Sequence, residues 1–167
     1  MAACASCGQA TVGKSKYCGV HKEVARQVWL DRVREGEEAR AEKQTELGRV
    51  FGAAEVAGVA AAEACVPVPM VVSEHENQFD DSSAVKQQWF VGEGVCGFAW
   101  VTIFPGGCAA ANWAKKHLGA KRGYYGGMEV WVSRFGQSMT RKEAFAGAFA
   151  AVLRDNGIEA YPGSRMD

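Results

Sequence analysis

Residues 95–104 read VCGFAWVTIF, and this run decides the fold of the C-terminal half of the chain. It is rich in β-branched and aromatic residues and is apolar on both faces, which predicts a central strand. The sequence PGG at residues 105–107 ends that strand. Residues 108–118, CAAANWAKKHL, then predict a helix, with Gly119 placed just after it as a C-terminal cap.

A second strand and a second helix follow. Residues 128–135, MEVWVSRF, alternate as a half-buried strand does. Thr140 and Glu143 have the spacing of a capping box, and apolar residues at helical spacing continue to an Asn-Gly stop. Residues 158–161 predict a short final strand. The order strand–helix–strand–helix–strand indicates a compact two-layer α/β sandwich, so we expect the α+β fold class.

The motif with the clearest chemistry lies at the N-terminus. The pattern Cys4-x2-Cys7-x10-Cys18-x2-His21 offers four ligands in two close pairs. Such pairs let thiolates converge on one ion at about 2.3 Å, while an imidazole completes a tetrahedron at about 2.0–2.1 Å. Because protein groups fill all four positions, we predict a closed, structural site with zinc as the cofactor. The alternative is a chance cluster of free thiols.

This knuckle, residues 1–21, resembles short zinc ribbons and treble-clef-like fingers. The resemblance implies a module that contacts nucleic acid or protein, and it does not choose between the two.

A densely charged stretch follows the knuckle. Residues 22–47 contain no proline and are dominated by helix formers, which predicts a long solvated helix with a break near Gly36. Its apolar residues form a short stripe, and we expect this part of the helix to pack on another element. The stripe consists of Val24, Val28, Trp29 and Val33.

The remaining organisation follows from composition and charge. An alanine- and proline-rich connector leads into an acidic segment, residues 73–83, that predicts a surface loop. Residues 1–82 carry nine bases and thirteen acids, whereas residues 83–167 carry ten bases and six acids. This asymmetry permits an anionic partner for the C-terminal half. The predicted domains are a zinc knuckle at residues 1–21, a charged helix with its Ala/Pro-rich connector at 22–84, and an α+β domain at 85–167.

Composition argues against several classes of protein. The formal net charge is zero, which disfavours a histone-like basic binder. Hydrophobic residues make up 48% of the chain, enough for a core, so wholesale disorder is not expected. We see neither a signal peptide nor an uninterrupted apolar span, and therefore expect a cytoplasmic protein without a membrane partner. In that compartment the six cysteines are expected to stay reduced.

No set of residues predicts catalysis. Cys65, Cys96 and Cys108 have no ligand spacing and are expected to be small buried hydrophobes. Cys108 and His117 would lie far apart along one helix, which disfavours a nucleophile and base pair. Phosphate-binding motifs are missing, and the glycines of residues 105–107 are weak evidence for an anion site. We therefore expect that the protein is not an enzyme.

Basic and aromatic residues of the C-terminal half form the second signal. Lysine and arginine hold phosphates, and tyrosine stacks on bases, so interleaving them is typical of nucleic-acid contacts. The competing interpretation is an ordinary solvated face. We expect Trp100, Trp131, Phe145 and Phe149 to belong to the core. The candidate contact residues are Lys115, Lys116, Lys121, Arg122, Tyr124, Tyr125, Arg141 and Lys142.

The C-terminal segment, residues 128–167, reads MEVWVSRFGQSMTRKEAFAGAFAAVLRDNGIEAYPGSRMD. From residue 95 onward, the general residue pattern is similar to that at the C-terminal ends of small uncharacterised bacteriophage-type proteins. The resemblance implies the cytoplasm of a bacterial host and transfers no catalytic residue.

These observations favour a zinc-binding, non-enzymatic accessory protein that contacts nucleic acid. One alternative is a protein-interaction adaptor or inhibitor that uses the charged helix. Another is a nucleotide-binding or sequestering domain built on Gly106, Gly107 and the arginine and tyrosine cluster. The partner is nucleic acid or protein, and the sequence leaves the oligomeric state open.

Overall fold

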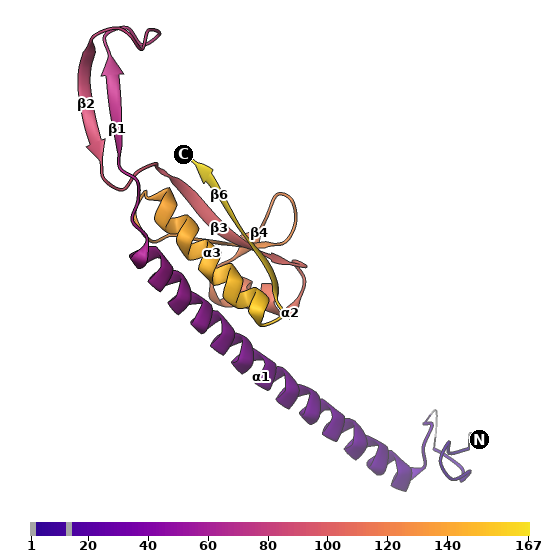
Figure 1. Ribbon diagram of the computed structural model, residues 1–167. Helices are drawn as coiled ribbons and strands as arrows, with labels where there is room; N and C mark the ends of the chain where they lie inside the picture. The colour runs from indigo at the N-terminus through magenta and orange to yellow at the C-terminus, as the bar shows by residue number, and fades with distance from the viewer. Residues whose placement is uncertain (1–2, 13–14) are drawn as a thin grey trace. The chain divides into compact units, whose positions relative to one another are not determined.

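The computed structural model describes residues 3–12 and 15–167 of the chain. The chain forms two compact units, Met1–Glu46 and Leu47–Asp167 (Figure 1). Helix α1 (Gly19–Ala64) contributes residues to both. The antiparallel sheets and three helices of the described residues confirm the predicted α+β class. The predicted knuckle belongs to the first unit, although its residues 1–2 and 13–14 lie outside the described part.

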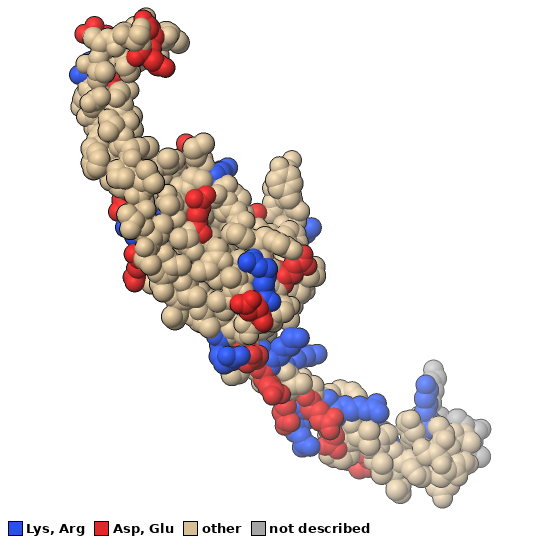
Figure 2. Space-filling view, viewed as in Figure 1, with Lys and Arg blue, Asp and Glu red and all other residues tan. Residues whose placement is uncertain are grey.

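Helix α1 runs for 46 residues without interruption, so the predicted break near Gly36 is wrong. A glycine inside a helix costs roughly 1 kcal/mol relative to alanine, which favourable side-chain pairs can offset. Arg34, two residues before the glycine, lies 3.2 Å from Asp31 and 3.9 Å from Glu38 along the helix surface. Figure 2 shows the resulting mixture of acidic and basic side chains on this part of the helix.

The apolar stripe of α1 is not buried. Val24, Val28 and Trp29 are 55%, 47% and 61% exposed, contrary to the expectation that they pack on another element.

Among the described residues, no helix is both long enough and apolar enough to cross a membrane.

The C-terminal unit is built on a four-stranded antiparallel sheet of order β4-β5-β3-β6. Strand β3 (Gly97–Phe104) is internal, as residues 95–104 predicted. It is flanked by β5 (Met128–Trp131), which carries the two-residue edge strand β4 (Lys121–Arg122), and by β6 (Glu159–Met166).

Strand β6 is longer than the short strand predicted from residues 158–161. It pairs along all of β3, from Gly97 opposite Met166 to Phe104 opposite Glu159. Pro162 argues against such a strand in the middle of a sheet, but β6 is an edge strand, where a missing N–H is tolerated.

One face of this sheet carries the core. Ala99, Val101 and Ile103 of β3 are at most 1% exposed, and helices α2 (Ala109–His117) and α3 (Met139–Asp155) cover them. The C-terminal part of α1 packs against α3, which lies between α1 and the sheet in Figure 1. A Cβ added at Gly58 of α1 would lie 2.7 Å from the Phe145 ring, so the close approach of these helices requires glycine.

Two predictions about side chains in this unit are corrected by the sheet and by helix α3. Phe145 and Phe149 are buried in the core as expected, but Trp100 and Trp131 project from the opposite face of the sheet. The capping box at Thr140 is also wrong, because α3 begins at Met139 with Ser138 as its N-cap. The Ser138 hydroxyl donates to the Glu93 carbonyl at 2.9 Å instead of capping the helix.

A separate two-stranded hairpin precedes β3. Strands β1 (Met70–His75) and β2 (Val85–Val91) pair antiparallel, and the acidic segment predicted as a loop supplies the end of β1 and the turn. Figure 2 shows acidic side chains gathered at the tip of the hairpin and a largely uncharged surface along its strands.

Candidate functional site

The first pair of ligands lies in a tight turn of the N-terminal unit. The Cys4 N–H donates to the Gln9 carbonyl at 2.7 Å, and the Gly8 N–H donates to the Cys4 carbonyl at 2.9 Å. Gly8 has a φ of 73°, a left-handed conformation that favours glycine directly after the second cysteine. The turn therefore brings the Cys4 and Cys7 sulfurs within 4.8 Å of each other.

The second pair lies where helix α1 starts. Cys18 directly precedes the helix, and its carbonyl accepts the Lys22 N–H at 2.8 Å. His21 therefore stands in the first helical turn, three residues from Cys18. A hydrogen bond of 2.9 Å from the Ala5 N–H to the Lys16 carbonyl joins the two pairs. Sequence spacing alone identified all four of these residues.

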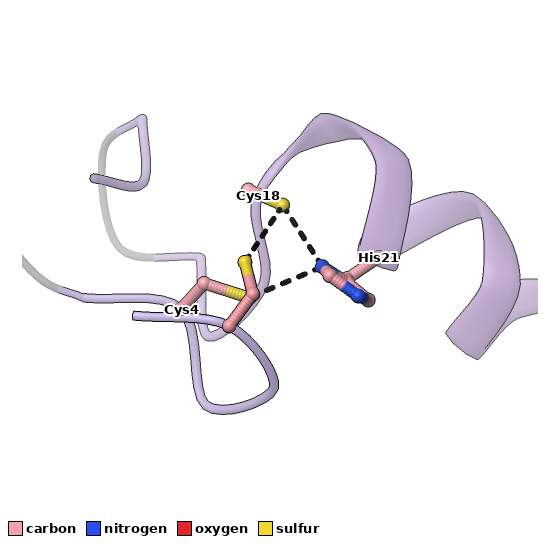
Figure 3. A group of neighbouring side chains, drawn as sticks. Cys4, Cys18 and His21 are labelled. Atoms are coloured by element: carbon pink, nitrogen blue, oxygen red, sulfur yellow. Dashed lines mark hydrogen bonds between the residues drawn. The ribbon is translucent and has the colours of Figure 1, made fainter. Parts of the chain in front are cut away.

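The four ligand atoms converge, and all lie within 4.8 Å of one another. Figure 3 shows the Cys4 and Cys18 side chains and the His21 ring directed toward one another. The Cys7 and Cys18 sulfurs are 3.7 Å apart, and His21 Nδ1 lies 3.8 Å from the Cys4 sulfur and 3.2 Å from the Cys18 sulfur. A tetrahedral zinc ion would separate two sulfurs by about 3.8 Å and a sulfur from a nitrogen by about 3.6 Å. The cluster therefore fits a tetrahedral metal ion.

Hydrogen bonds within the cluster favour the ionised forms of Cys4 and Cys18. The backbone amide of Cys18 lowers the pKa of the Cys4 thiol to about 6. The backbone and then the ring of His21 lower the pKa of Cys18, and in turn the Cys18 side chain raises the pKa of His21. The Gln9 backbone lowers the pKa of Cys7, but lost hydration and the neighbouring sulfurs raise it overall. Thiolates are the form of cysteine that binds metals.

A basic hollow of about 610 Å³ lies in the C-terminal unit, between α2, β4 and the turn after β3. Lys115, Lys121 and Arg122 line it together with the Asn112 amide, and none of the described acidic residues belongs to its lining. Gly106 forms part of the wall because a Cβ there would lie 3.0 Å from the backbone of the facing β4–β5 turn. We call this site the basic hollow. It gathers positive charge where the sequence predicted anion contacts.

The other predicted contact residues are placed differently. Lys116 is exposed on α2 but does not line the basic hollow. Tyr124 and Tyr125 are 93% and 92% exposed on the turn between β4 and β5, with their rings edge to face at 5.0 Å. Both are open to solvent and touch each other.

Arg141 and Lys142 are engaged within the fold. Arg141 forms an ion pair of 2.8 Å with Glu93 and donates to the Ala62 carbonyl at 2.9 Å. Lys142 is 4% exposed, and its Nζ donates to the Gly97 carbonyl at 2.8 Å. The structure therefore does not bring these two side chains to the basic hollow. Both lie in the first turns of α3, where the sheet and α1 are packed.

Sequence reasoning missed the residues of the exposed sheet face. The signal was present in β3, where Phe98, Trp100 and Phe104 alternate with the buried Ala99 and Ile103. An apolar run with bulky aromatic residues at every second position and small or aliphatic residues between them is typical of a strand with two different faces.

Comparisons with known proteins assign neither a family nor a function to this chain. No protein-family model, no curated protein and no solved structure matches this chain. The resemblance to bacteriophage-type proteins therefore gains no support. The chain itself shows a Cys4, Cys7, Cys18 and His21 cluster that could hold a metal ion, consistent with a knuckle-like feature.

Proposed function

We propose that this chain is a zinc-binding, non-enzymatic accessory protein whose C-terminal unit contacts nucleic acid. The observation that carries the proposal is the basic hollow, where Lys115, Lys121 and Arg122 converge without a described acidic residue in the lining. Phosphate contacts supply most of the affinity in such complexes, because each one releases bound counterions.

The lining residues suit a phosphate in complementary ways. Arg122 carries a planar guanidinium that can donate two parallel hydrogen bonds to phosphate oxygens. Lys115 and Lys121 act as point charges, and the Asn112 amide adds a neutral donor. The exposed Tyr124 and Tyr125 offer aromatic surface on the neighbouring turn.

Zinc has a structural role in this proposal. Zinc is the preferred ion for three thiolates and one imidazole at tetrahedral spacing, and four protein ligands leave no position open for a substrate. The ion would hold the Cys4–Cys7 turn against the start of α1. The chemistry that zinc supplies here is the crosslinking of two short segments.

The test measures anisotropy of labelled single-stranded DNA, duplex DNA and RNA with the full chain. We expect binding at low salt that weakens steeply as salt rises. The variant Lys121→Ala/Arg122→Ala should bind less tightly, and its log–log salt slope should fall by about 1.4 on single strands and about 1.8 on duplex. The matched control Lys86→Ala/Arg134→Ala also removes two charges from this unit, but neither residue lines the basic hollow.

Absence of binding to all three probes at low salt would retire this proposal. Equal loss in the control variant would show that the effect is general charge rather than the basic hollow. Another outcome is that mononucleotides compete with the labelled probe at concentrations too low for their ionic strength alone to displace it. That result would favour the nucleotide-binding alternative, since a volume of about 610 Å³ is within the range of small-molecule sites.

The adaptor alternative has an observation of its own. The β1–β2 hairpin exposes Val71 and Phe90 on one face and Val72 and Trp89 on the other, at 57%, 74%, 43% and 43%. A two-stranded ribbon is marginally stable alone in water, so apolar residues on both faces favour a protein partner. Light scattering over a concentration series checks whether that partner is a second copy, and Phe90→Ser should then shift the chain toward monomer.

A further inference from the structure

We propose that the exposed face of the β4-β5-β3-β6 sheet is a platform on which unpaired bases of a single-stranded nucleic acid stack. This inference rests on the proposed nucleic-acid function and goes beyond it, because it names the strand state and a second set of residues. Its starting point is the alternation of β3, which buries one face under α2 and α3 and leaves the other free of the described helices.

Strand pairing determines which side chains share the exposed face. Trp100 lies opposite Trp131 of β5 on one side and Gly163 of β6 on the other. One row away, Phe98 lies opposite Arg165. These residues come from three strands and are separated by up to 67 positions in the sequence.

The aromatic rings form one continuous layer. Trp100 and Trp131 stack with centroids 5.0 Å apart and an angle of 24°, and Phe98 meets Trp131 edge-on at 6.1 Å. Gly163 leaves room for this layer, since a Cβ there would lie 2.7 Å from the Trp100 ring. Trp131 is nevertheless 43% exposed, so its ring offers surface to a ligand.

A second aromatic pair extends the layer along β3. Phe104 and Tyr161 lie 6.3 Å apart, and Tyr161 is 51% exposed. Rings spread along a strand match the repeated flat faces of successive bases, which stack on aromatic side chains with little sequence preference.

The charges around the layer favour a polyanion. The Arg165 guanidinium lies 5.4 Å from the Phe98 ring centre and 5.9 Å from that of Trp131, so a cation sits at the aromatic surface. Trp131 also shares a shallow hollow with Lys121 and Arg122, which line the basic hollow as well. Phosphates held by these two cations would therefore place the next nucleotides beside the aromatic layer.

Two acidic residues share the exposed face as well: Glu129 of β5, and Glu159 of β6, which stands opposite Phe104. Glu129 lines the shallow hollow, but its carboxylate accepts the Trp131 indole N–H at 3.2 Å and stands opposite Lys121 in the sheet. Glu129 therefore orients the indole, and it stands opposite the basic residue Lys121 in the strand register. Aromatic surface next to cations matches a flexible strand with free base faces, whereas the bases of a duplex are closed to stacking.

The experiment compares three probes of equal length: oligothymidylate, the same phosphate backbone with abasic sugars, and a duplex. The full chain should bind oligothymidylate most tightly. Trp131→Ala should weaken that affinity by about 5- to 150-fold, the range for one stacked base, and leave affinity for the abasic strand unchanged. Trp131→Phe should retain most of the binding. Phe79→Ala is the matched control, because Phe79 is 98% exposed on the hairpin turn.

A second variant tests the platform independently, in case Trp131→Ala does not fold. Tyr161→Ala removes a ring that is half exposed, and it should also weaken oligothymidylate binding while the melting temperature stays near that of the parent. Equal affinity of the parent for thymidylate and abasic strands would overturn the platform and leave the basic hollow intact. Loss of binding only in Lys121→Ala/Arg122→Ala would do the same, whereas failure of every probe would reject the proposed function itself.

Discussion

At the scale of single residues, Lys142 is the clearest case of a side chain whose role differs from its type. Its ammonium group is buried, donates to the Gly97 carbonyl at 2.8 Å and lies 5.4 Å from the Phe98 ring. A buried charge is tolerated only when it is hydrogen-bonded, so this lysine connects α3 to the start of β3.

We expect Lys142→Met to destabilise the C-terminal unit by about 1–3 kcal/mol, because methionine fills the space but leaves the Gly97 carbonyl without its partner. Urea denaturation followed by circular dichroism measures the difference. Lys116→Met, at an exposed position on α2, is the control and should change the free energy of unfolding by less than about 0.5 kcal/mol. Equal effects of the two substitutions would show that the buried hydrogen bond contributes nothing.

At the scale of elements, two helical glycines separate the contribution of packing to stability from that of intrinsic helix propensity. A Cβ added at Gly147 of α3 would meet no neighbouring residue within 4 Å, whereas a Cβ added at Gly58 of α1 would lie 2.7 Å from the Phe145 ring. Gly147→Ala should therefore stabilise the unit by about 0.5–1 kcal/mol through helix propensity. Gly58→Ala should destabilise it by about 1–3 kcal/mol, because the helices must move apart.

Thermal melts of both variants check this pair of predictions, and the substitution is the same in each. Two shifts in the same direction would contradict the tight contact between α1 and α3. A third variant, Gly163→Ala, addresses the sheet in the same way: its Cβ would displace the Trp100 ring, and we expect lower stability with altered tryptophan fluorescence.

At the scale of the whole molecule, the two compact units predict separable responses to metal. The purified chain should carry about one zinc ion, because four ligands converge on one point. Cys7→Ser should lose the ion, since three remaining ligands hold zinc less tightly, and Cys65→Ser should retain it because Cys65 lies outside the cluster. Elemental analysis of protein prepared without chelator measures the zinc content.

The same Cys7→Ser chain should keep the cooperative melt of Leu47–Asp167, which has its own buried core. Hydrogen exchange would then report lost protection only in the turn that holds Cys4 and Cys7. Loss of the C-terminal melt in this variant would show that the two units depend on each other.

Features that depend on neighbouring residues could be predicted from the sequence. The metal cluster is encoded by two ligand pairs whose spacing forces local convergence, and the sequence identified all four residues. Strand β3, helices α2 and α3, and the α+β class follow from hydrophobic periodicity, which is a pattern between residues that are close in the sequence.

Other features depended on contacts between distant parts of the chain. Lys142 meets Gly97 across 45 positions, and no local pattern distinguishes that buried lysine from the exposed lysines of α2. Trp100 and Trp131 look like core residues in a linear sequence, yet the docking of α2 and α3 on the other face of β3 leaves them on the exposed side. The Cys4, Cys7, Cys18 and His21 cluster and the succession of β3, α2, β5, α3 and β6 could be predicted from the sequence, whereas strands β2 and β4 could not. Packing rather than local spacing determines which face of the sheet is covered, so that choice is visible only in the folded chain.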